Sequence, residues 1–598
     1  MHTGIAYLNA PRLQRCLSAG LHNLIAQQTY LNQINVFPVP DGDTGNNLAQ
    51  TARAGLQVLT QYSGNNLGEL VTELADAMLD NAQGNSGALL AQFFQGFATS
   101  VGKQEKIGTL FFATAITAAA IYTRTALDDP REGTILSAID ASAQAADKAA
   151  DTGDFTCLLP AIETATQAAL KLTTAQLEVL EKAGVVDAGA AGYCAIIEGC
   201  TKFLREGSLR ESMPAIAADE IIHIHHEPVT RLEYRYCTEC LVSGAGLDAA
   251  KIRAGLHTMG DSLVIAGSSA RLRIHIHTNN PQEIFRHMAQ FGELQKTKAD
   301  DMQSQYRALG RDNHSIAIVT DSAADIPEAV ITELDIHMVP LRVSFGDKTY
   351  LDKIGMSPDE FRHELNSNFA RPGTSQPSIG DFSRKYEFLT THFSEVVSIS
   401  LSSKLSGTYQ ASRMAASRIS GSERITLIDS KNVSVGQGLI VKYAAELAME
   451  GLNAAKIQSA LAKEIASIRT FALVTDLNNA VRSGRLQPSI KRLAEWLRLT
   501  PILTNTLAGK VGVHRFIFGH FQLIERFVRH IAKTMGPESN WEIAVAYGGD
   551  NPQQAELLKA ELHRQFSNMA KIWHTDIGPA FGVHAGMDAL VVALRKIS

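Results

Sequence analysis

The chain has 598 residues, of which 45% are hydrophobic and 19% charged, and its formal net charge is -6. A chain of this length is too long for one hydrophobic core, so about three domains are expected, and its few cysteines indicate a reducing cytoplasm rather than a disulfide scaffold. The negative charge argues against binding nucleic acid by neutralising its phosphates. No apolar run reaches the roughly 18 residues that span a bilayer. The first residues lack the basic and apolar regions that a signal peptide has.

Residues 1–207 are predicted to form an all-α domain. Over residues 12–34, leucine and isoleucine recur at the spacing of one face of an amphipathic helix. Almost nothing in this part of the chain alternates between apolar and polar residues as a half-buried strand does. Alanine-rich helical patterns follow at residues 66–82, 86–101, 107–126, 134–150, 157–171, 174–183 and 189–205.

A short turn between two helical patterns holds two carboxylates. Asp41 and Asp43 flank Gly42 and follow Pro38 and Pro40. Glycine lets the chain bend sharply here, and proline cannot continue a helix. Oxygen ligands this close together suit Mg²⁺, which binds one or two carboxylates together with substrate phosphates. The alternative is a solvated Asp-Gly turn, which is the commoner case for this motif alone.

Further turns of small residues each precede a helical pattern, at residues 83–87, 131–134 and 186–189. The N–H groups at the N-terminus of a helix have no partner within the helix, and they favour anions. Several such helix ends near a carboxylate pair would build a pocket for a nucleotide and Mg²⁺.

The sequence Asn-Val-Phe-Pro-Val-Pro-Asp-Gly-Asp-Thr-Gly at residues 35–45 resembles the nucleotide-binding domain of dihydroxyacetone kinases. It is most similar to the version in the kinase subunit of bacterial fatty acid kinase, and residues 84–87, 132–136 and 184–189 resemble that family's other blocks in the same order. The resemblance implies a barrel of antiparallel helices, with ATP at one end and Mg²⁺ between the phosphates and the two aspartates. Dihydroxyacetone kinases have a third metal-binding aspartate where this chain has Val36, so the number of Mg²⁺ ions stays open.

The residues that the resemblance assigns to this site fall into two groups. Those with a catalytic role are Asp41, Asp43 and Thr134, and the two aspartates are the Mg²⁺ ligands. Those that surround the nucleotide are Asn35, Thr44, Asn47, Gly84, Asn85, Ser86, Gly87, Gly133 and Asp187.

Residues 215–310 contain two strand-like runs, at 233–242 and 270–278. On a strand, His275 and His277 point to the same face, where Cys237 of a neighbouring strand could meet them. Neutral imidazoles and a thiolate suit Zn²⁺, with Cys240 as a fourth ligand. Surface histidines beside a buried thiol fit the same pattern, so both interpretations stay open.

The order Tyr-Cys-Thr-Glu followed by His-Ile-His-Thr-Asn resembles the middle domain of the same kinase subunit. The resemblance implies a small α+β domain with a structural Zn²⁺ held by Cys237, His275 and His277. It assigns no role to Cys240.

Short apolar strands alternate with helical patterns over residues 314–598. This alternation is typical of an α/β domain with largely parallel sheets, which binds ligands at the carboxyl ends of its strands. Serine and threonine hydroxyls cluster there and can donate to a carboxylate, whereas a serine nucleophile lacks its Gly-x-Ser-x-Gly elbow. Strands are expected at residues 315–320, 336–343, 396–401, 425–428, 471–475 and 541–546.

This region resembles the DegV family of fatty-acid-binding proteins along its whole length. The resemblance implies a two-lobed α/β fold in which Thr374 and Ser406 hold a fatty carboxylate and His584 joins their hydrogen bonds. It also implies that Arg485 contacts the kinase part. The matching segments are residues 320–325, 373–378, 405–410, 483–485 and 578–584.

The two resemblances together imply that ATP phosphorylates a protein-bound fatty acid to give an acyl phosphate and ADP. The implied cofactors are ATP, Mg²⁺ and a structural Zn²⁺, and the implied partners are a fatty acid, a second copy of the chain in a homodimer, and a membrane acyltransferase that receives the acyl phosphate. Three alternatives remain: a fatty-acid carrier or sensor with a regulatory nucleotide domain, a dihydroxyacetone-type kinase for another small substrate, and a zinc-stabilised adaptor. The length and saturation of the fatty acid, and transfer within or between chains, stay open.

Overall fold

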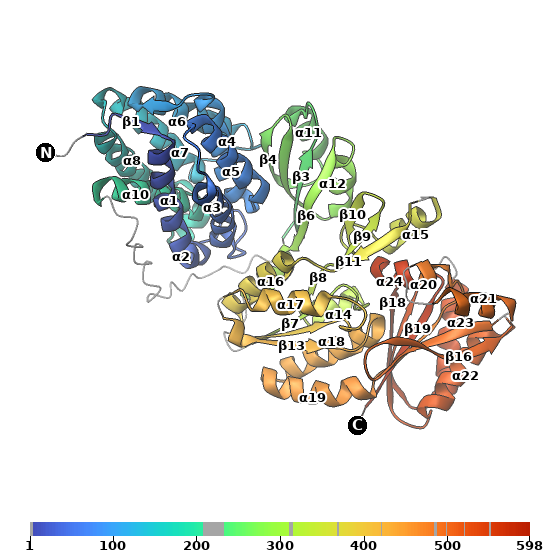
Figure 1. Cartoon of the computed structure of the whole chain (residues 1–598). Helices are drawn as coiled ribbons and strands as arrows, with labels where there is room; N and C mark the ends of the chain where they lie inside the picture. The colour runs from blue at the N-terminus through green and yellow to red at the C-terminus, as the bar shows by residue number, and fades with distance from the viewer. Residues whose placement is uncertain are drawn as a thin grey trace. The chain divides into compact units, whose positions relative to one another are not determined.

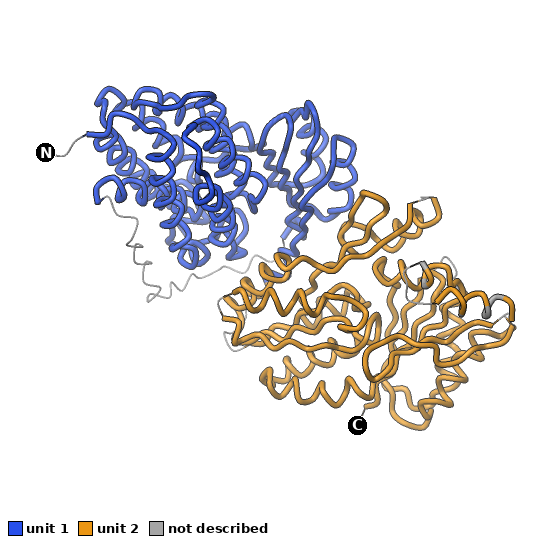
Figure 2. The backbone as a smooth tube through the Cα atoms, in the orientation of Figure 1, with its two compact units in different colours: residues 1–306 blue, residues 307–598 orange. Residues whose placement is uncertain are grey.

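The computed structural model describes residues 4–206, 232–309, 315–367, 370–419, 421–482, 487–497, 499–519, 521–548 and 552–597. The chain divides into two compact units, residues 1–306 and 307–598 (Figure 2). Among the described residues, four clusters of buried apolar side chains each lie within one unit, so each unit has its own core.

Unit 1 begins with a ring of helices, drawn in blue in Figure 1. Each helix packs on the next from α3 to α8, and α10 closes the ring by packing on both α8 and α1. This arrangement is the helical barrel that the sequence predicts. The helices are α1 (Ala10–Ala26), α2 (Gln28–Gln33), α3 (Thr44–Gln61), α4 (Leu67–Asn81), α5 (Gly84–Val101), α6 (Thr109–Arg124), α7 (Ile135–Ala149), α8 (Phe155–Gln176), α9 (Glu178–Ala183) and α10 (Ala188–Glu206).

Some boundaries in the ring differ from the prediction. Residues 12–34 form α1 and α2 rather than one helix, because Gln27 leaves the helical conformation with φ -91° and ψ 6°. Helix α8 runs through residues 171–174, where two helices were expected, because no glycine or proline separates them. A short antiparallel pair, β1 (Tyr7–Asn9) and β2 (Lys106–Gly108), was not anticipated.

The rest of unit 1 is an antiparallel sheet in the order β4-β5-β3-β6, drawn in green in Figure 1. Helices α11 and α12 pack on its strands. The elements are β3 (Tyr236–Ser243), α11 (Ala249–Leu256), β4 (Asp261–Ser268), β5 (Arg271–Thr278), α12 (Pro281–Met288), β6 (Glu293–Asp301) and α13 (Met302–Leu309), the last of which crosses into unit 2.

This sheet is joined to the helical ring by a shared core. Val264 and Ala266 of β4 belong to the same cluster of buried residues as the ring helices. Between them, Ile265 N–H donates to the Ala126 carbonyl at 2.8 Å, and Gly267 N–H donates to Gln92 Oε1 at 2.6 Å. The sheet therefore presents one of its faces to α5.

The first lobe of unit 2 is built on a parallel sheet in the order β13-β12-β7-β8. Alternate side chains of β7 face opposite ways: Val319 packs with α16 and α17, and Ile318 packs with α18 and α19. Both faces are thus covered, as Figure 1 shows. The elements are β7 (Ile316–Asp321), α14 (Glu328–Glu333), β8 (Ile336–Val339), α16 (Ile379–His392), β12 (Glu395–Ser400), α17 (Thr408–Ala416), β13 (Ile425–Asp429), α18 (Ser434–Met449) and α19 (Ala454–Ser467).

The second lobe is built on a six-stranded sheet in the order β16-β15-β14-β19-β17-β18. Its elements are β14 (Arg469–Leu473), α20 (Asn478–Arg482), α21 (Pro488–Trp496), β15 (Leu499–Asn505), β16 (Val511–Phe518), α22 (Leu523–Met535), β17 (Trp541–Tyr547), α23 (Pro552–Gln565), β18 (Met569–Asp576), α24 (Pro579–Ala585) and β19 (Leu590–Lys596).

A small antiparallel sheet, in the order β10-β9-β11, is separate from the main sheets of both lobes. It consists of β9 (Arg342–Phe345), β10 (Lys348–Leu351) and β11 (Pro372–Ser375), and α15 (Pro358–Ser367) lies between β10 and β11 in the chain.

The two-lobed α/β fold agrees with the prediction, but two details do not. Parallel sheets were expected throughout, yet in the six-stranded sheet only β17 and β18 are parallel neighbours. Residues 336–343 were expected as one strand, but the chain leaves β8 at Pro340 and enters β9 in another sheet, because proline cannot donate to a sheet ladder.

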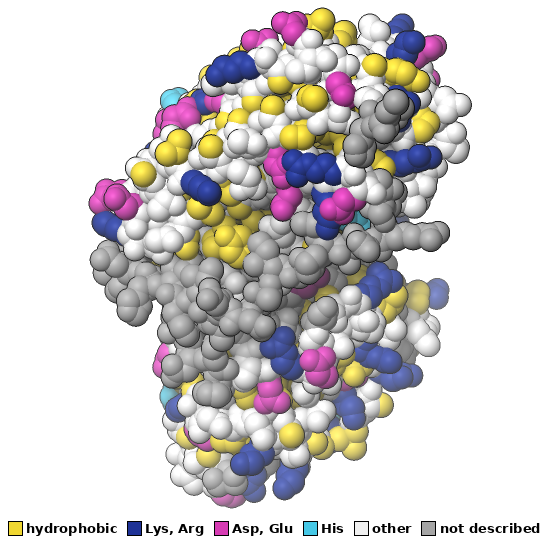
Figure 3. Space-filling model, turned by 90° about the vertical axis from the view of Figure 1, so that its left-hand side faces the viewer, with side chains coloured by type: hydrophobic (Ala, Val, Ile, Leu, Met, Phe, Trp, Pro, Cys, Tyr) yellow, Lys and Arg dark blue, Asp and Glu magenta, His cyan; other side chains and the backbone are white. Residues whose placement is uncertain are grey.

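Among the helices of the described residues, none combines the length and apolarity needed to cross a membrane. On the face drawn in Figure 3, basic and acidic side chains are interspersed rather than gathered into a stripe of one sign.

Candidate functional site

The turn before α3 places two carboxylates beside each other. Gly42 between them has φ 67°, a left-handed conformation that glycine adopts without steric cost. Buried amides hold both carboxylates: Asn35 Nδ2 donates to Asp41 Oδ1 at 2.7 Å, and Asn47 Nδ2 donates to Asp43 Oδ1 at 2.7 Å. Of the predicted nucleotide residues, Asn35 and Asn47 therefore act on the carboxylates directly. Thr44 supports them, because its hydroxyl donates to Asn35 Oδ1.

The two carboxylates resist ionising together. Burial raises the pKa of Asp41 well above its ordinary value, and the Asp43 carboxylate raises it further. Burial also raises the pKa of Asp43, the Lys298 ammonium lowers it, and the Asp300 carboxylate raises it. A divalent cation relieves such repulsion. The paired oxygen donors fit Mg²⁺, which prefers carboxylate ligands together with phosphate and water.

Helix α5 begins next to this pair. Gly84, its first residue, has φ +62°, and a Cβ there would lie 2.4 Å from Asn47 Nδ2, the amide that holds Asp43. Only glycine therefore allows the start of α5 to approach the carboxylates. Gly87 packs as tightly, because its Cβ would lie 2.7 Å from Thr51 Oγ1. Asn85 Oδ1 is buried without a hydrogen-bond partner among the described residues, which is consistent with a ligand at this helix N-terminus.

Asp187, which is only 5% exposed, joins the starts of α7 and α10, and Gly189 brings them against α5. Asp187 accepts the backbone N–H of Ala190 at 2.7 Å and a backbone N–H from Ile135 at the start of α7. A Cβ on Gly189 would lie 2.9 Å from Ser86 Oγ in α5. Three helix N-termini thus converge, which is the arrangement that attracts phosphate groups.

Thr134 has a structural task in this arrangement. It is the N-cap of α7, where its hydroxyl accepts Leu136 N–H at 3.3 Å and donates to the Arg131 carbonyl at 2.8 Å. Gly133, with φ +82°, makes the preceding turn. Both residues lie at one of the converging helix ends, so their predicted role at the phosphates stays a proposal.

The face of the middle sheet that carries polar side chains completes this end of the ring. Side chains alternate along a strand, so Cys237 and Glu239 of β3 share a face with their cross-strand neighbours. Cys237 lies opposite His277 of β5, and Glu239 opposite His275. On β6, the neighbour of Glu239 is Lys298. This face approaches the ring directly, because Glu239 Oε1 accepts the N–H of Gly84 at 2.9 Å.

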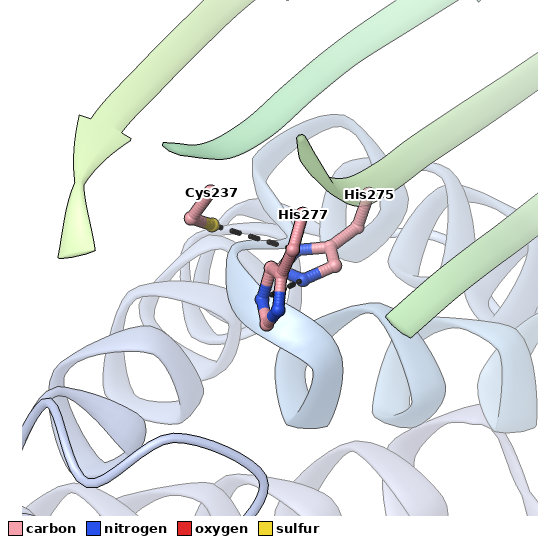
Figure 4. A group of neighbouring side chains, drawn as sticks. All are labelled: Cys237, His275 and His277. Carbon is pink, nitrogen blue, oxygen red and sulfur yellow. Dashed lines mark hydrogen bonds between the residues drawn. The ribbon is translucent and has the colours of Figure 1, made fainter. Parts of the chain in front are cut away.

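The sheet brings Cys237, His275 and His277 together, as predicted for a zinc site. Their ligand atoms lie within 4.8 Å of one another, and all three residues are buried. They point toward one another in Figure 4, where dashed lines join Cys237 Sγ to His275 Nδ1 at 3.8 Å and His275 Nε2 to His277 Nε2 at 3.3 Å. Two nitrogen ligands of one tetrahedral zinc, at about 2.0–2.1 Å each, would lie about 3.3 Å apart.

The surroundings of the two histidines also fit Zn²⁺. His275 Nδ1 lies 3.5 Å from Glu239 Oε1, and His277 Nδ1 lies 3.2 Å from Asp261 Oδ1. Carboxylates placed behind histidines in this way orient metal-binding imidazoles. Burial lowers the pKa of His275, which favours the neutral ring that binds metals.

Cys240 does not take part in this cluster. Its cross-strand neighbour is Ile274, which lies between Arg273 and His275 and therefore faces the other side of the sheet. Burial raises the pKa of the Cys240 thiol to about 12. The sequence left the role of Cys240 open, and this register does not favour it as a fourth zinc ligand, because residues separated by three positions on a strand point to opposite faces.

The sequence interpretation missed several charged residues of this face: Glu239, Asp261, Arg273, Lys298 and Asp300. For Arg273, Lys298 and Asp300 the signal was present in the alternation of β5 and β6, where charged residues or histidines occupy alternate positions. They were overlooked because alternating charge is typical of a solvated face. Here Glu239, Arg273 and Lys298 are buried.

In unit 2, the predicted lipid-binding residues lie on β11, just before α17 and in the last turn of α24. Thr374 Oγ1 of β11 and His584 Nε2 of α24 form a hydrogen bond of 2.9 Å. Ser406 precedes α17, where its hydroxyl bonds that of Thr408 at 2.9 Å. The two segments touch, because Gln376 Oε1 approaches Gly407 so closely that a Cβ would lie 2.1 Å from it.

Buried carboxylates of the first lobe hold the beginning of α24 and so position His584. Asp352 Oδ1 accepts Ala580 N–H at 3.0 Å, and Asp325 Oδ1 accepts Gly578 N–H at 3.0 Å. Lys353 Nζ lies 2.8 Å from Asp325 Oδ1, and burial raises the pKa of Asp352 to about 6. Arg485, predicted to contact the kinase part, lies outside the described residues.

Family models match three consecutive parts of the chain. Residues 38–202 match the DAK2 domain, residues 233–309 match the FakA-like middle domain of fatty acid kinase, and residues 315–596 match the DegV family of uncharacterised proteins. Their order agrees with the resemblances seen in the sequence.

Whole-protein relatives and solved structures cover part of the chain. Uncharacterised proteins of Staphylococcus aureus strains USA300 and COL are each 32% identical over 317 residues, which are 51% of this chain and 58% of theirs. The chain thus matches less than two thirds of these relatives. A DegV family protein from Thermus thermophilus, described by its fatty acid binding, is 26% identical with a TM-score of 0.44 and covers 47% of this chain and 100% of its own. DegV from Bacillus subtilis, described as a fatty acid binding protein, is 28% identical with a TM-score of 0.43 and covers 47% of this chain and 99% of its own.

Asp187→Asn is expected to remove a pH dependence of stability. Burial raises the pKa of Asp187 from 3.8 to about 7, so the folded chain holds this proton more tightly than the unfolded chain does. The resulting stability is fully present below pH 3.8 and is lost as the pH rises through about 7. The thermal unfolding midpoint of unit 1 should therefore fall with rising pH in the wild type relative to Asp187→Asn, whose amide oxygen can still accept Ala190 N–H.

Asp147→Asn makes the same change of charge at an exposed position of α7 and controls for net charge. If the midpoints of wild type and Asp187→Asn ran parallel across this pH window, the assignment of a raised pKa to Asp187 would be wrong.

Proposed function

We propose that this chain, in which a DAK2 domain, a FakA-like middle domain and a DegV domain follow one another, uses ATP to phosphorylate the carboxylate of a bound fatty acid. The observation that supports the proposal is that one polypeptide holds two groups of residues suited to the two halves of this reaction. The first is the Asp41–Asp43 pair beside converging helix N-termini. The second is the Thr374–His584 pair in a DegV domain.

The proposed reaction requires no proton transfer. A carboxylate oxygen of the fatty acid attacks the γ-phosphorus of ATP, the bond from that phosphorus to the β–γ bridging oxygen breaks, and the products are acyl phosphate and ADP. A fatty carboxylate has a pKa of ~4.3 and is already ionised near neutral pH, so no general base is required. Catalysis then depends on positioning and on neutralising charge, as in phosphoryl transfer generally.

The residues of unit 1 are suited to the phosphate side of this reaction. Bound Mg²⁺ would neutralise phosphate charge between Asp41, Asp43 and the nucleotide. The N–H groups at the starts of α5, α7 and α10 would bind phosphate oxygens, with Ser86, Gly87 and Thr134 at those helix ends. Asn35 and Asn47 keep both carboxylates aimed at the metal.

The residues of unit 2 are suited to hold the carboxylate that reacts. A threonine hydroxyl and an imidazole 2.9 Å apart can both donate to one carboxylate. Ser406, beside the contact between Gln376 and Gly407, would supply a further hydroxyl. The Zn²⁺ that Cys237, His275 and His277 would hold is assigned a structural role in this proposal.

The first test offers purified full-length protein Mg·ATP and oleic acid. ADP release is measured with a coupled assay, and acyl phosphate is trapped with hydroxylamine as the acyl hydroxamate. Both signals should appear only when the fatty acid is present. Asp43→Asn should lower them by roughly 100-fold, since it removes half of the charge that holds the metal.

Asp147→Asn, an exposed aspartate in α7, is the matched control and should keep wild-type turnover. If the protein bound fatty acid but released no ADP in response to it, the carrier or sensor alternative would be favoured instead. ADP release with a small ketone but not with fatty acids would favour the dihydroxyacetone-type alternative.

The second test concerns the lipid carboxylate. Thr374→Ala should weaken fatty acid binding by about tenfold, because a hydrogen bond to a charged group contributes about 1.5–3 kcal/mol. Ser375→Ala, the exposed neighbour on β11, is the matched control. Displacement of a fluorescent fatty acid measures both affinities, and equal affinities of the two variants would remove Thr374 from the binding site.

The third test asks whether phosphate passes within one chain or between two. Asp41→Ala/Asp43→Ala lacks the proposed metal site, and Thr374→Ala/Ser406→Ala lacks the proposed lipid site. A tether keeps two sites at an effective concentration of order mM, which favours transfer within one chain. An equimolar mixture should then stay inactive in the hydroxamate assay, whereas recovered activity would show transfer between chains in a dimer.

A further inference from the structure

One carboxylate in the interior of unit 1 contacts both candidate sites of that unit. Glu239 is 1% exposed, and its Oε1 accepts the N–H of Gly84, the first residue of α5, at 2.9 Å. The same oxygen lies 3.5 Å from His275 Nδ1 and 3.8 Å from Cys237 Sγ.

Two buried cations fix the orientation of this carboxylate. Arg273 Nη2 donates to Glu239 Oε2 at 2.6 Å, and Lys298 Nζ lies 3.4 Å from Oε1. The sheet register enforces these contacts, since Glu239 lies directly opposite His275 on one neighbouring strand and opposite Lys298 on the other. A buried ionised carboxylate that lost these partners would be strongly destabilised, so Glu239 has little freedom to move by itself.

The cations also tie Glu239 to the carboxylate pair. Lys298 acts electrostatically on Asp43 as well as on Glu239. At the start of α5, a Cβ on Gly84 would lie 2.4 Å from the Asn47 amide that holds Asp43. A small displacement of Glu239 would therefore reach the proposed nucleotide site by two routes, through the backbone of α5 and through Lys298.

We infer that Glu239 is a positioning residue that couples metal binding at Cys237, His275 and His277 to nucleotide binding at Asp41, Asp43 and the start of α5. The Nδ1 of His275 lies 3.5 Å from Glu239 Oε1 and 3.8 Å from Cys237 Sγ, and its Nε2 lies 3.3 Å from His277 Nε2, so Nε2 is the nitrogen that a metal shared with His277 would take. A metal there holds the His275 ring, the ring holds Glu239, and Glu239 holds Gly84 N–H in place. Without the metal, the ring no longer restrains Oε1, the oxygen that accepts Gly84 N–H, while Arg273 still holds Oε2.

The coupling has a thermodynamic signature. When two ligands are coupled through the protein, each changes the affinity for the other by the same factor, commonly about 5- to 150-fold. The inference rests on the proposed function only in naming the nucleotide. Its test uses Mg·ADP and Zn²⁺ binding, and needs neither a fatty acid nor turnover.

The experiment measures the dissociation constant for Mg·ADP by calorimetry, with full-length protein freed of zinc by a chelator and again after adding one equivalent of Zn²⁺. Zinc should tighten Mg·ADP binding by about tenfold in the wild type. Saturating Mg·ADP should tighten Zn²⁺ binding, measured against a competing chelator, by the same factor. In Glu239→Gln both factors should fall to about one.

Arg271→Ala is the matched control. Arg271 lies on the same strand as His275 and binds Asp80 of α4 at 3.2 Å, so its loss breaks an ion pair between the middle sheet and the ring that involves neither Glu239 nor Gly84. This variant should keep the tenfold coupling. Loss of coupling in both variants would mean that any loosening of the contact uncouples the sites, and would overturn the specific role of Glu239.

The inference can still be tested if the zinc-free protein is unstable. If the zinc-free wild type unfolds by circular dichroism, the zinc-loaded proteins are compared, and Glu239→Gln should bind Mg·ADP about tenfold more weakly than the wild type and Arg271→Ala. Equal affinities would overturn the inference. A wild type that binds Mg·ADP equally with and without zinc would overturn the coupling alone, whereas a wild type that never binds Mg·ADP would overturn the proposed function as well.

Discussion

Burial of like charges is the constraint on which unit 1 depends. Two aspartates on one turn are driven into a partly dry site, where desolvation and mutual repulsion both oppose their ionised form. Neighbouring side chains contact each of these carboxylates and stabilise its charge. Amides from Asn35 and Asn47 hold the carboxylates, and the Lys298 ammonium comes from a strand more than two hundred residues later in the chain.

The same constraint explains why the ring and the middle sheet form one body. A ring of helices alone would leave the starts of α5, α7 and α10 open to water, where helix dipoles are screened. The middle sheet covers this end with a face that alternates charged and metal-binding side chains, and Glu239, Arg273 and Lys298 neutralise one another there. Burial at this end therefore strengthens electrostatic interactions with any anion that binds.

Unit 2 also buries carboxylates, and each of them has fixed hydrogen-bond or ion-pair partners. Its buried aspartates, Asp325 and Asp352, accept backbone N–H groups at the start of α24 and have partners in Lys353 and Ser322. These contacts join the second lobe to the first and set the position of His584, four to six residues further along the chain. The Thr374–His584 pair of the proposed lipid site is thereby held in place by buried carboxylates.

Local patterns in the sequence determined the fold class, because helix periodicity, strand alternation and glycine at turns depend on near neighbours. They also identified Asp41 and Asp43 and the Cys237, His275 and His277 cluster, since the separation of two on a strand places both histidines on one face. The sequence did not reveal the split of residues 336–343, the antiparallel six-stranded sheet, or the burial of Glu239 and Lys298. Those features depend on which strands pair and on what covers a face, and pairing brings together residues far apart in the chain. A strand with a charged residue at every second position has the same sequence pattern whether that face contacts water or another domain. Only the tertiary structure therefore decided that this face was buried.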